Sequence, residues 1–391
     1  IREVFTLKYK KLKNTLISLG IIISSPFISS VIMKIVPNVS VTANRLANTT
    51  IGESSKDIIL SDKDTIPAPQ IVQETTSDWS NDIISNGLGW NYSLNDTSDF
   101  NFFDEKFNKN AGEKPYPNLD TLTNHSGEVV QTIFNNYSGN QYVTLSSGAL
   151  VKNVTSVSNN VLANESKNLP NFTIDLNSNE PQVLIMHTHT TESFEPFERT
   201  YYDNSFSYRT TDNSKNVVMI GDAITNELQN LGINTIHSTT VHDYPSYTGS
   251  YERSAVTVQN ILNEYPSIKV VLDIHRDALS RDGNLLQPVV EIDGKKSAQI
   301  MIISGCDDGT MDMPNYIKNF RFASLLQNQI YSDYGDFARP ILFDYRKYNQ
   351  NLTTGSLLIE VGTHGSTLEQ VRYAGQLLGK SIGKALVSIS G

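Results

Sequence analysis

The sequence predicts an α/β fold with a mostly parallel sheet that is flanked by helices. From residue 181 onward, short Val, Ile and Leu runs without polar alternation are typical of buried parallel strands, and helical patterns lie between them. Three of these runs carry residues that bind metal or transfer protons at their ends: Val183–Met186 precedes His187 and His189, and two later runs carry His275 and Glu360. Open α/β sheets bind ligands outside the carboxyl ends of their strands, so these residues are expected to meet in one site.

The other expected elements alternate between strands and helices, as this fold class requires. Gly232 and Pro266 end the first two helices, and Ser366 with Glu369 has the spacing of a capping box at the start of the last one. Further strands are expected at 233–238, 269–275, 289–292, 299–304 and 356–361, and helices at 215–231, 251–264, 316–334 and after 366.

A short glycine-containing segment, Gly375–Ser381, is similar to a phosphate-binding loop. It has one residue too few between its glycines, and it lies inside the last helical pattern rather than after a strand. We therefore interpret this segment as part of the helix.

The first 36 residues predict a membrane anchor. Residues 1–13 are basic and are expected to stay in the cytoplasm, while residues 14–36 contain Lys34 as their only charge and are long enough to cross a bilayer core of roughly 20 residues. A cleaved signal peptide is the alternative, but the apolar span is longer than the usual hydrophobic region of such peptides. With an uncleaved anchor, the rest of the chain is extracytoplasmic.

We predict that protease added to intact protoplasts removes the part of the chain after residue 37, because the basic residues flank only one side of the apolar span. An immunoblot for the C-terminal part, before and after treatment, measures this. Complete protection would contradict the predicted topology.

Composition divides the rest of the chain into three parts. Residues 37–84 are rich in Ser, Thr, Asn and Asp and are expected to form a flexible linker. Residues 85–180 combine aromatic residues, short apolar runs and turns, which predicts a small accessory region. Residues 181–391 carry the α/β pattern and are predicted to form the catalytic domain.

Charge and cysteine content argue against other classes of protein. The net charge of −10, with no dominant basic face outside the N-terminus, argues against a nucleic-acid partner. The sequence has one cysteine, Cys306, so neither an intrachain disulfide nor a thiolate metal cluster can form. Cys306 follows a predicted strand, and we interpret it as a small buried residue rather than a nucleophile.

The residue types at the strand ends indicate a zinc site. Two imidazoles and a carboxylate hold Zn²⁺ with an open fourth position for water, and a further carboxylate takes the proton from that water. His and Glu side chains at three strand ends supply such a set.

These segments resemble a known family. Together with His242-Asp-Tyr-Pro-Ser-Tyr and Tyr348-Asn-Gln-Asn-Leu-Thr-Thr-Gly-Ser, the strand-end segments are similar to the stage II sporulation protein P family, from about Pro170 to the C-terminus. More distantly they resemble zinc-dependent N-acetylmuramoyl-L-alanine amidases. The resemblance implies a membrane-anchored peptidoglycan hydrolase of sporulation engulfment. It also implies a place between mother cell and forespore, with stage II sporulation proteins D and M as partners.

The resemblance to the amidases also implies roles for single residues. It makes His189 and His275 the imidazole ligands of zinc and Glu360 the general base. The glutamate ligand of the amidases precedes their first helix, where this chain has Ser214-Lys215-Asn216, so the third ligand must come from elsewhere. We expect Glu192, three residues after His189, with His187 as the alternative ligand.

A second group of polar residues is expected around these ligands. Some are expected to contact the substrate or the ligands themselves, and the arginines have the bidentate geometry that binds a carboxylate of a stem peptide. The candidates are His242, Arg253, Arg276, Asp277 and His364, with Arg209 as a further arginine.

The activity that follows is hydrolysis of the amide between the muramic lactyl group and the first alanine of the stem peptide. The family resemblance also implies endopeptidase cleavage of peptide crosslinks. A wall-binding scaffold without catalysis and a zinc carboxypeptidase or deacetylase on the same polymer remain open alternatives.

Overall fold

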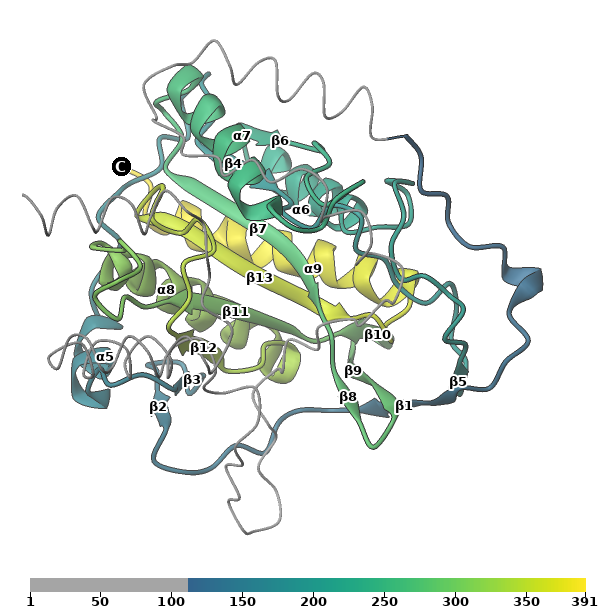
Figure 1. Cartoon of the computed structure of the whole chain (residues 1–391). Helices are drawn as coiled ribbons and strands as arrows, with labels where there is room; N and C mark the ends of the chain where they lie inside the picture. Colours follow the sequence, from purple (N-terminus) through teal and green to yellow (C-terminus); the bar gives the residue numbers. More distant parts are fainter. Residues whose placement is uncertain (1–111) are drawn as a thin grey trace, which may run out of the picture. The chain divides into compact units, whose positions relative to one another are not determined.

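The structure, a computed structural model, describes residues 112–391, and eight of the strands in this range form the main sheet (Figure 1). The predicted segments 1–13, 14–36 and 37–84, and the first part of 85–180, lie outside the described residues. Within residues 112–391, no helix combines the length and the apolar content that a membrane crossing requires. The strand order across the sheet is β2 (Tyr142–Thr144), β3 (Leu150–Asn153), β12 (Ile341–Asp344), β11 (Ile300–Gly305), β13 (Gly355–Thr363), β7 (Val270–Asp277), β4 (Val183–Met186) and β6 (Thr235–His237).

The strand directions divide the sheet into two blocks. The strands β13, β7, β4 and β6 are parallel to their neighbours within one block, and β3, β12 and β11 are parallel within the other. The blocks meet where β11 pairs antiparallel with β13. As a result, β4, β7 and β13 end at one edge of the sheet, whereas Cys306, which follows β11, is buried at the opposite edge.

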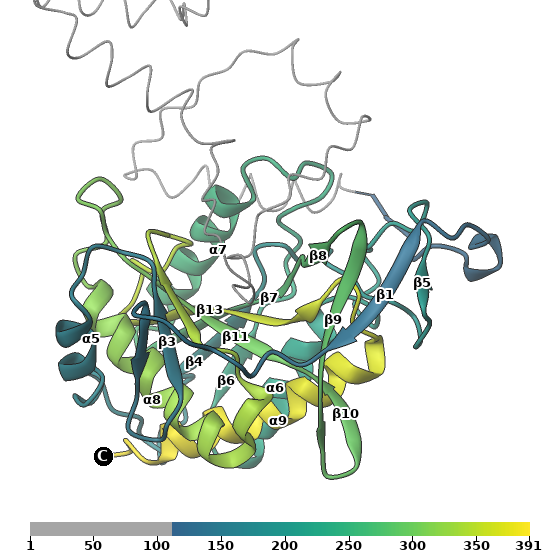
Figure 2. The same cartoon turned by 90° about the horizontal axis from the view of Figure 1, so that it is seen from below.

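Helices cover both faces of the sheet, which confirms the predicted α/β class. Figure 2 shows α6 (Val218–Asn230), α8 (Tyr316–Tyr334) and α9 (Leu368–Val387) on one face and α7 (Ser250–Glu264) on the other. Successive side chains of a strand point to opposite faces of the sheet, so each strand packs against the helices on both faces. Ile185 and Leu272 belong to the large core with α6, α8 and α9, while their strand neighbours Met186 and Val271 pack with α7.

The glycine-containing segment of the last helix is a packing surface. Gly375, Gly379 and Gly383 recur every four residues on α9, and a Cβ at Gly379 would lie 3.0 Å from the Cα of Ile224 in α6. Such spacing places small residues on one helical face and allows two helices to approach closely. The interpretation of this segment as helix, rather than as a phosphate-binding loop, is confirmed.

A second sheet lies beside the main one. Its order is β10 (Lys295–Ala298), β9 (Asn284–Ile292), β1 (Gly127–Thr132) and β5 (Tyr201–Tyr202), and β8 (Ser280–Arg281) pairs with β9. The region 85–180 therefore contributes β1 to this sheet and β2 and β3 to the main sheet, along with α5 (Asn159–Glu165).

Several element boundaries differ from the sequence-based expectation. The helix expected from 215 begins at Val218, because Asn216 pairs with Ser193 and its side chain caps the amide of Val218. The capping box of α9 is formed by Thr367 and Gln370, one residue later than expected. The strand β12 was not predicted.

Candidate metal centre

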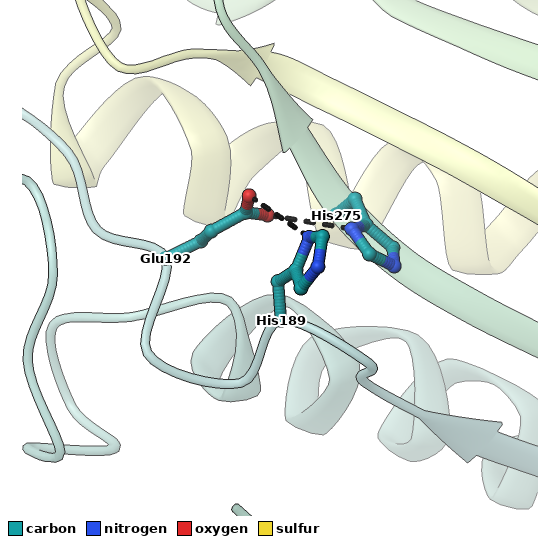
Figure 3. A group of neighbouring side chains, drawn as sticks. All are labelled: His189, Glu192 and His275. Atoms are coloured by element: carbon teal, nitrogen blue, oxygen red, sulfur yellow. Dashed lines mark ion pairs between the residues drawn. The ribbon is translucent and has the colours of Figure 1, made fainter. Parts of the chain in front are cut away.

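Three predicted ligands lie together at the edge where β4 and β7 end (Figure 3). His189 and Glu192 stand on the turn after β4, and His275 lies near the end of the neighbouring β7. All three are buried, and one ligand atom from each lies within 4.8 Å of the others.

Glu192 lies between the two imidazoles. Its Oε1 is 3.5 Å from Nδ1 of His189, and its Oε2 is 3.5 Å from Nδ1 of His275. The other ring nitrogens have their own contacts: Nε2 of His275 lies 2.8 Å from Oδ1 of Asp273, and Nε2 of His189 lies 3.1 Å from Oγ of Ser250. Both Nδ1 atoms therefore face the same carboxylate, and each Nε2 atom has a polar atom of another residue beside it.

This donor set fits zinc. Two imidazole nitrogens and one carboxylate oxygen are the ligands of catalytic zinc sites, which leave a fourth position open. Metal-binding histidines usually direct the second ring nitrogen to a carboxylate, as His275 does to Asp273. The group of two histidines and one glutamate therefore has both the donor atoms and the outer contacts of such a site.

Electrostatics in the group favour a cation. Burial alone would raise the pKa of Glu192, but hydrogen bonds from His189 and His275 and the charge of Arg276 hold it well below its usual range. Burial opposes a charge on His275, yet Asp273 and Glu192 raise its pKa well above the usual value. A divalent cation would replace this proton, so metal binding is expected to release protons.

Asp273 links the two ligand-bearing segments. Besides its contact with His275, its carboxylate accepts hydrogen bonds from the backbone amide of Thr188 at 2.8 Å and from the Thr188 hydroxyl at 2.6 Å. Asp273 was not among the predicted site residues, although its position two residues before His275 places both on one side of the strand.

We predict that Asp273→Asn weakens zinc binding by about 10- to 100-fold, the loss typical of outer partners of a metal-binding histidine. The shape of the side chain is kept, while its charge next to His275 is lost. Competition with a chromophoric chelator measures the affinity. Unchanged affinity would show that Asp273 does not support the ligand.

Glu360 lies directly beside His275 on the neighbouring strand β13. The two residues are register partners of a parallel pair, so their side chains share the α7 face of the sheet. The register shifts just after Glu360, at a bulge where Gly362 has φ 66°; bulges of this kind re-aim side chains next to active sites. A side chain at residue 362 would collide with Ser366.

Glu360 has the properties of a proton acceptor. Its Oε2 is buried and has no hydrogen-bond partner among the described residues. Burial, together with the nearby carboxylate of Asp277, raises the pKa of Glu360 to about 8. A cation in the neighbouring candidate metal group would lower this pKa again, and a carboxylate with one unpartnered oxygen that titrates near neutral pH suits a general base.

His187 lies on the opposite face of the sheet. Its Nδ1 contacts the backbone oxygen of Ile274 at 2.9 Å, and its Nε2 contacts Nε2 of His237 at 2.9 Å. Its ring packs against α6, where a Cβ on Gly221 would lie 2.8 Å from Nε2. The chain turns after His187. Of these two histidines, only His189 therefore lies on the α7 face, together with Glu192 and His275.

The other predicted site residues mainly hold local structure. His242 bridges the backbone oxygen of His187 and the hydroxyl of Thr257. Arg253 donates three hydrogen bonds to backbone oxygens of the loop before α7. The Arg276 side chain donates to backbone oxygens of Ser193 and Tyr208, while its amide donates to Oε2 of Glu192 at 3.1 Å.

Asp277 and His364 lie beyond the ligands at the same edge. Asp277 pairs with Arg339 at 2.9 Å and with Thr363 in the sheet register. The amide of His364 donates to the backbone oxygen of Asp277, and its ring packs against Tyr208 at 5.2 Å. Burial and the charge of Arg276 lower the pKa of His364 to about 3, so its ring is neutral at physiological pH.

Aromatic residues that the sequence analysis did not single out surround the ligands. Tyr247 stacks on His189 with ring centroids 4.6 Å apart and remains 50% exposed, and the guanidinium of Arg209 lies 4.9 Å from the centroid of the Tyr247 ring. Arg209 also pairs with Asp243 at 2.8 Å and lies 3.7 Å from Oε1 of Glu192. Tyr251 contacts both imidazoles.

Comparison with known proteins decides the family. The model of the family "Stage II sporulation protein P (SpoIIP)" matches residues 106–383. The chain belongs to this family. Stage II sporulation protein P of Bacillus subtilis (strain 168) is 28% identical over 203 residues, which cover 49% of this chain and 48% of that protein. The chain thus matches about half the length of this relative of the SpoIIP family.

Solved structures at low sequence identity were also matched. The N-acetylmuramoyl-L-alanine amidase of Clostridium difficile 630 is 18% identical, with a TM-score of 0.33, over 54% of this chain and 97% of that one. An N-acetylmuramoyl-L-alanine amidase of Nostoc punctiforme is 13% identical, with a TM-score of 0.33, over 54% and 97%. A metallo-carboxypeptidase from Burkholderia cenocepacia is 10% identical, with a TM-score of 0.32, over 55% and 59%.

Proposed function

We propose that this SpoIIP family member is a zinc-dependent N-acetylmuramoyl-L-alanine amidase that removes stem peptides from peptidoglycan during sporulation engulfment. One observation carries the proposal: a buried His189, Glu192 and His275 group lies beside Glu360, whose Oε2 has no hydrogen-bond partner among the described residues. Membership of the sporulation family supports the cell-wall polymer as the substrate.

The residues have separate tasks in this proposal. His189, Glu192 and His275 hold the metal, and Asp273 orients His275. Bound zinc supplies a Lewis acid at an open position, where the pKa of water is lowered toward neutrality. Glu360 accepts the proton of the attacking water at Oε2 and returns it to the leaving amine nitrogen, so one carboxylate serves both halves of the reaction.

We also propose a cellular location for the reaction. Residues 14–36 anchor the chain in the membrane, and the catalytic part acts outside the cytoplasm, between mother cell and forespore. Stage II sporulation proteins D and M are the proposed partners. Endopeptidase cleavage of crosslinks at the same metal centre is a further activity that product analysis would detect.

The test is digestion of purified peptidoglycan by the full chain, with mass spectrometry of the products. The proposal predicts stem peptides with a free alanine amino group, glycan strands with a free lactyl carboxylate, and loss of both products after chelation. Release of free terminal amino acids or of acetate instead would indicate a carboxypeptidase or a deacetylase. Zinc-free protein that binds the wall without any product would indicate a scaffold.

A further inference from the structure

Two tyrosine rings form a stack on the candidate ligand His275. Tyr251 of α7 lies nearly parallel to His275, with ring centroids 6.4 Å apart and planes inclined by 8°. Tyr348 lies nearly parallel to Tyr251, at 5.1 Å and 20°. Interacting aromatic pairs have centroid separations of about 4.5–7 Å. We call these three residues the ring stack; it runs from the metal centre to the loop between β12 and β13.

The loop that carries Tyr348 has a backbone conformation that most side chains disfavour. Tyr348 has φ 43° and Asn349 has φ 55°, so two consecutive non-glycine residues occupy the left-handed region. A bulky residue in this region is an outlier, and it persists only where the surrounding structure determines it. Strain of this kind is concentrated at functional sites.

Contacts from α7, α8 and β11 hold this loop. The Asn349 side-chain amide donates to the backbone oxygen of Tyr251 at 2.8 Å and to the hydroxyl of Ser254 at 3.0 Å. Next to it, the buried Gln350 side chain accepts from the amide of Gly305 at 2.9 Å and donates to the oxygen of Ile303 at 3.1 Å. The loop is therefore tied to the same residue, Tyr251, on which Tyr348 stacks.

The polar contacts of His275 are made through its two ring nitrogens, and the rings of His189 and Tyr251 lie against it. Glu192 and Asp273 contact the two ring nitrogens, and such contacts act near the plane of the imidazole. Tyr251 lies nearly parallel to this ring and also meets His189 edge-on at 5.4 Å. Residues that fix the orientation of a metal-binding histidine contribute to the affinity for the metal.

We propose that Tyr348 is a positioning residue of the metal centre. The left-handed loop places its ring against Tyr251, and Tyr251 holds the His275 imidazole in the orientation that binds the ion. This inference rests on the proposed zinc site, and it assigns a role to the Tyr348-Asn-Gln-Asn segment that the catalytic proposal leaves without one.

Zinc affinity of the full chain tests the inference without any activity assay. Tyr348→Leu keeps an apolar side chain but removes the stacking ring, Tyr348→Phe keeps the ring, and Lys347→Ala is a control in the same loop. We expect Tyr348→Leu to bind zinc about 10-fold or more weakly in competition with a chromophoric chelator. We expect Tyr348→Phe and Lys347→Ala to stay close to the wild type, and the visible spectrum of the Co²⁺-substituted protein to change only in Tyr348→Leu.

Wild-type affinity and an unchanged Co²⁺ spectrum in Tyr348→Leu would overturn the inference while leaving the proposed function in place. A wild-type chain that binds no zinc would reject both. If Tyr348→Leu does not fold, Asn349→Gly decides the question. Glycine accepts the left-handed conformation but lacks the side-chain amide that ties the loop to α7. Weaker zinc binding in a folded Asn349→Gly chain would support the inference, and unchanged binding would overturn it.

Discussion

His189→Ala and His275→Ala are expected to remove both the metal and the hydrolytic activity. In the proposed site each imidazole supplies one of three ligands, and two remaining protein ligands are not expected to hold catalytic zinc. The zinc content of the purified chain should fall from about one per chain to near zero. Release of stem peptides should fall to the background of the assay.

His187→Ala is the matched control for this prediction. His187 follows the same strand as His189, but its ring lies on the opposite face, paired with His237. This variant is expected to lose some stability and to keep its zinc. Glu192→Ala should lose the metal, because the Glu192 carboxylate faces both imidazoles. Full zinc occupancy in Glu192→Ala, together with zinc loss in His187→Ala, would show that the third ligand is His187.

Glu360→Gln is expected to keep both fold and zinc while turnover falls by about 10² or more, the loss typical of a positioned general base. The substitution is nearly isosteric, and Glu360 lies outside the three-ligand group, so the metal should remain bound. The neutral amide cannot accept a proton from water. Zinc content and stem-peptide release are measured on the same preparation.

Glu291→Gln provides the control, because Glu291 is an exposed carboxylate on β9. This variant should have normal turnover. Near-normal turnover in Glu360→Gln would eliminate Glu360 as the base. Loss of metal in that variant would instead place Glu360 among the ligands and leave the proton acceptor unassigned.

The grouping of the candidate site residues was predictable because the sequence places them at strand ends. His189, His275 and Glu360 each follow or end an apolar run, and β4, β7 and β13 prove to be neighbours that end at one edge. Because β13 and β7 are parallel neighbours, their register places Glu360 beside His275, and no other sequence motif is needed to predict this. Glu192 follows His189 by three residues, and a tight turn lies between them. The turn places the Glu192 carboxylate next to the His189 ring.

Other features depend on contacts that no local pattern encodes. The apolar run of β11 does not reveal its direction, so the antiparallel pairing with β13 could not be predicted. The role of Asp273 depends on β4 lying next to β7, where Thr188 reaches its carboxylate. From the sequence, Arg253 and Arg276 were expected to be able to bind a carboxylate of the substrate. In the structure, their guanidinium groups donate hydrogen bonds to backbone oxygens.

The most direct test of the metal centre is an anomalous difference map from crystals of the zinc-loaded full chain, recorded at the zinc absorption edge. We expect one strong peak at bonding distance, about 2.0–2.2 Å, from Nδ1 of His189, a carboxylate oxygen of Glu192 and Nδ1 of His275. Glu360 should lie close to this peak without binding the ion. A peak between other side chains, or no peak at this group in zinc-saturated crystals, would contradict the proposed metal centre.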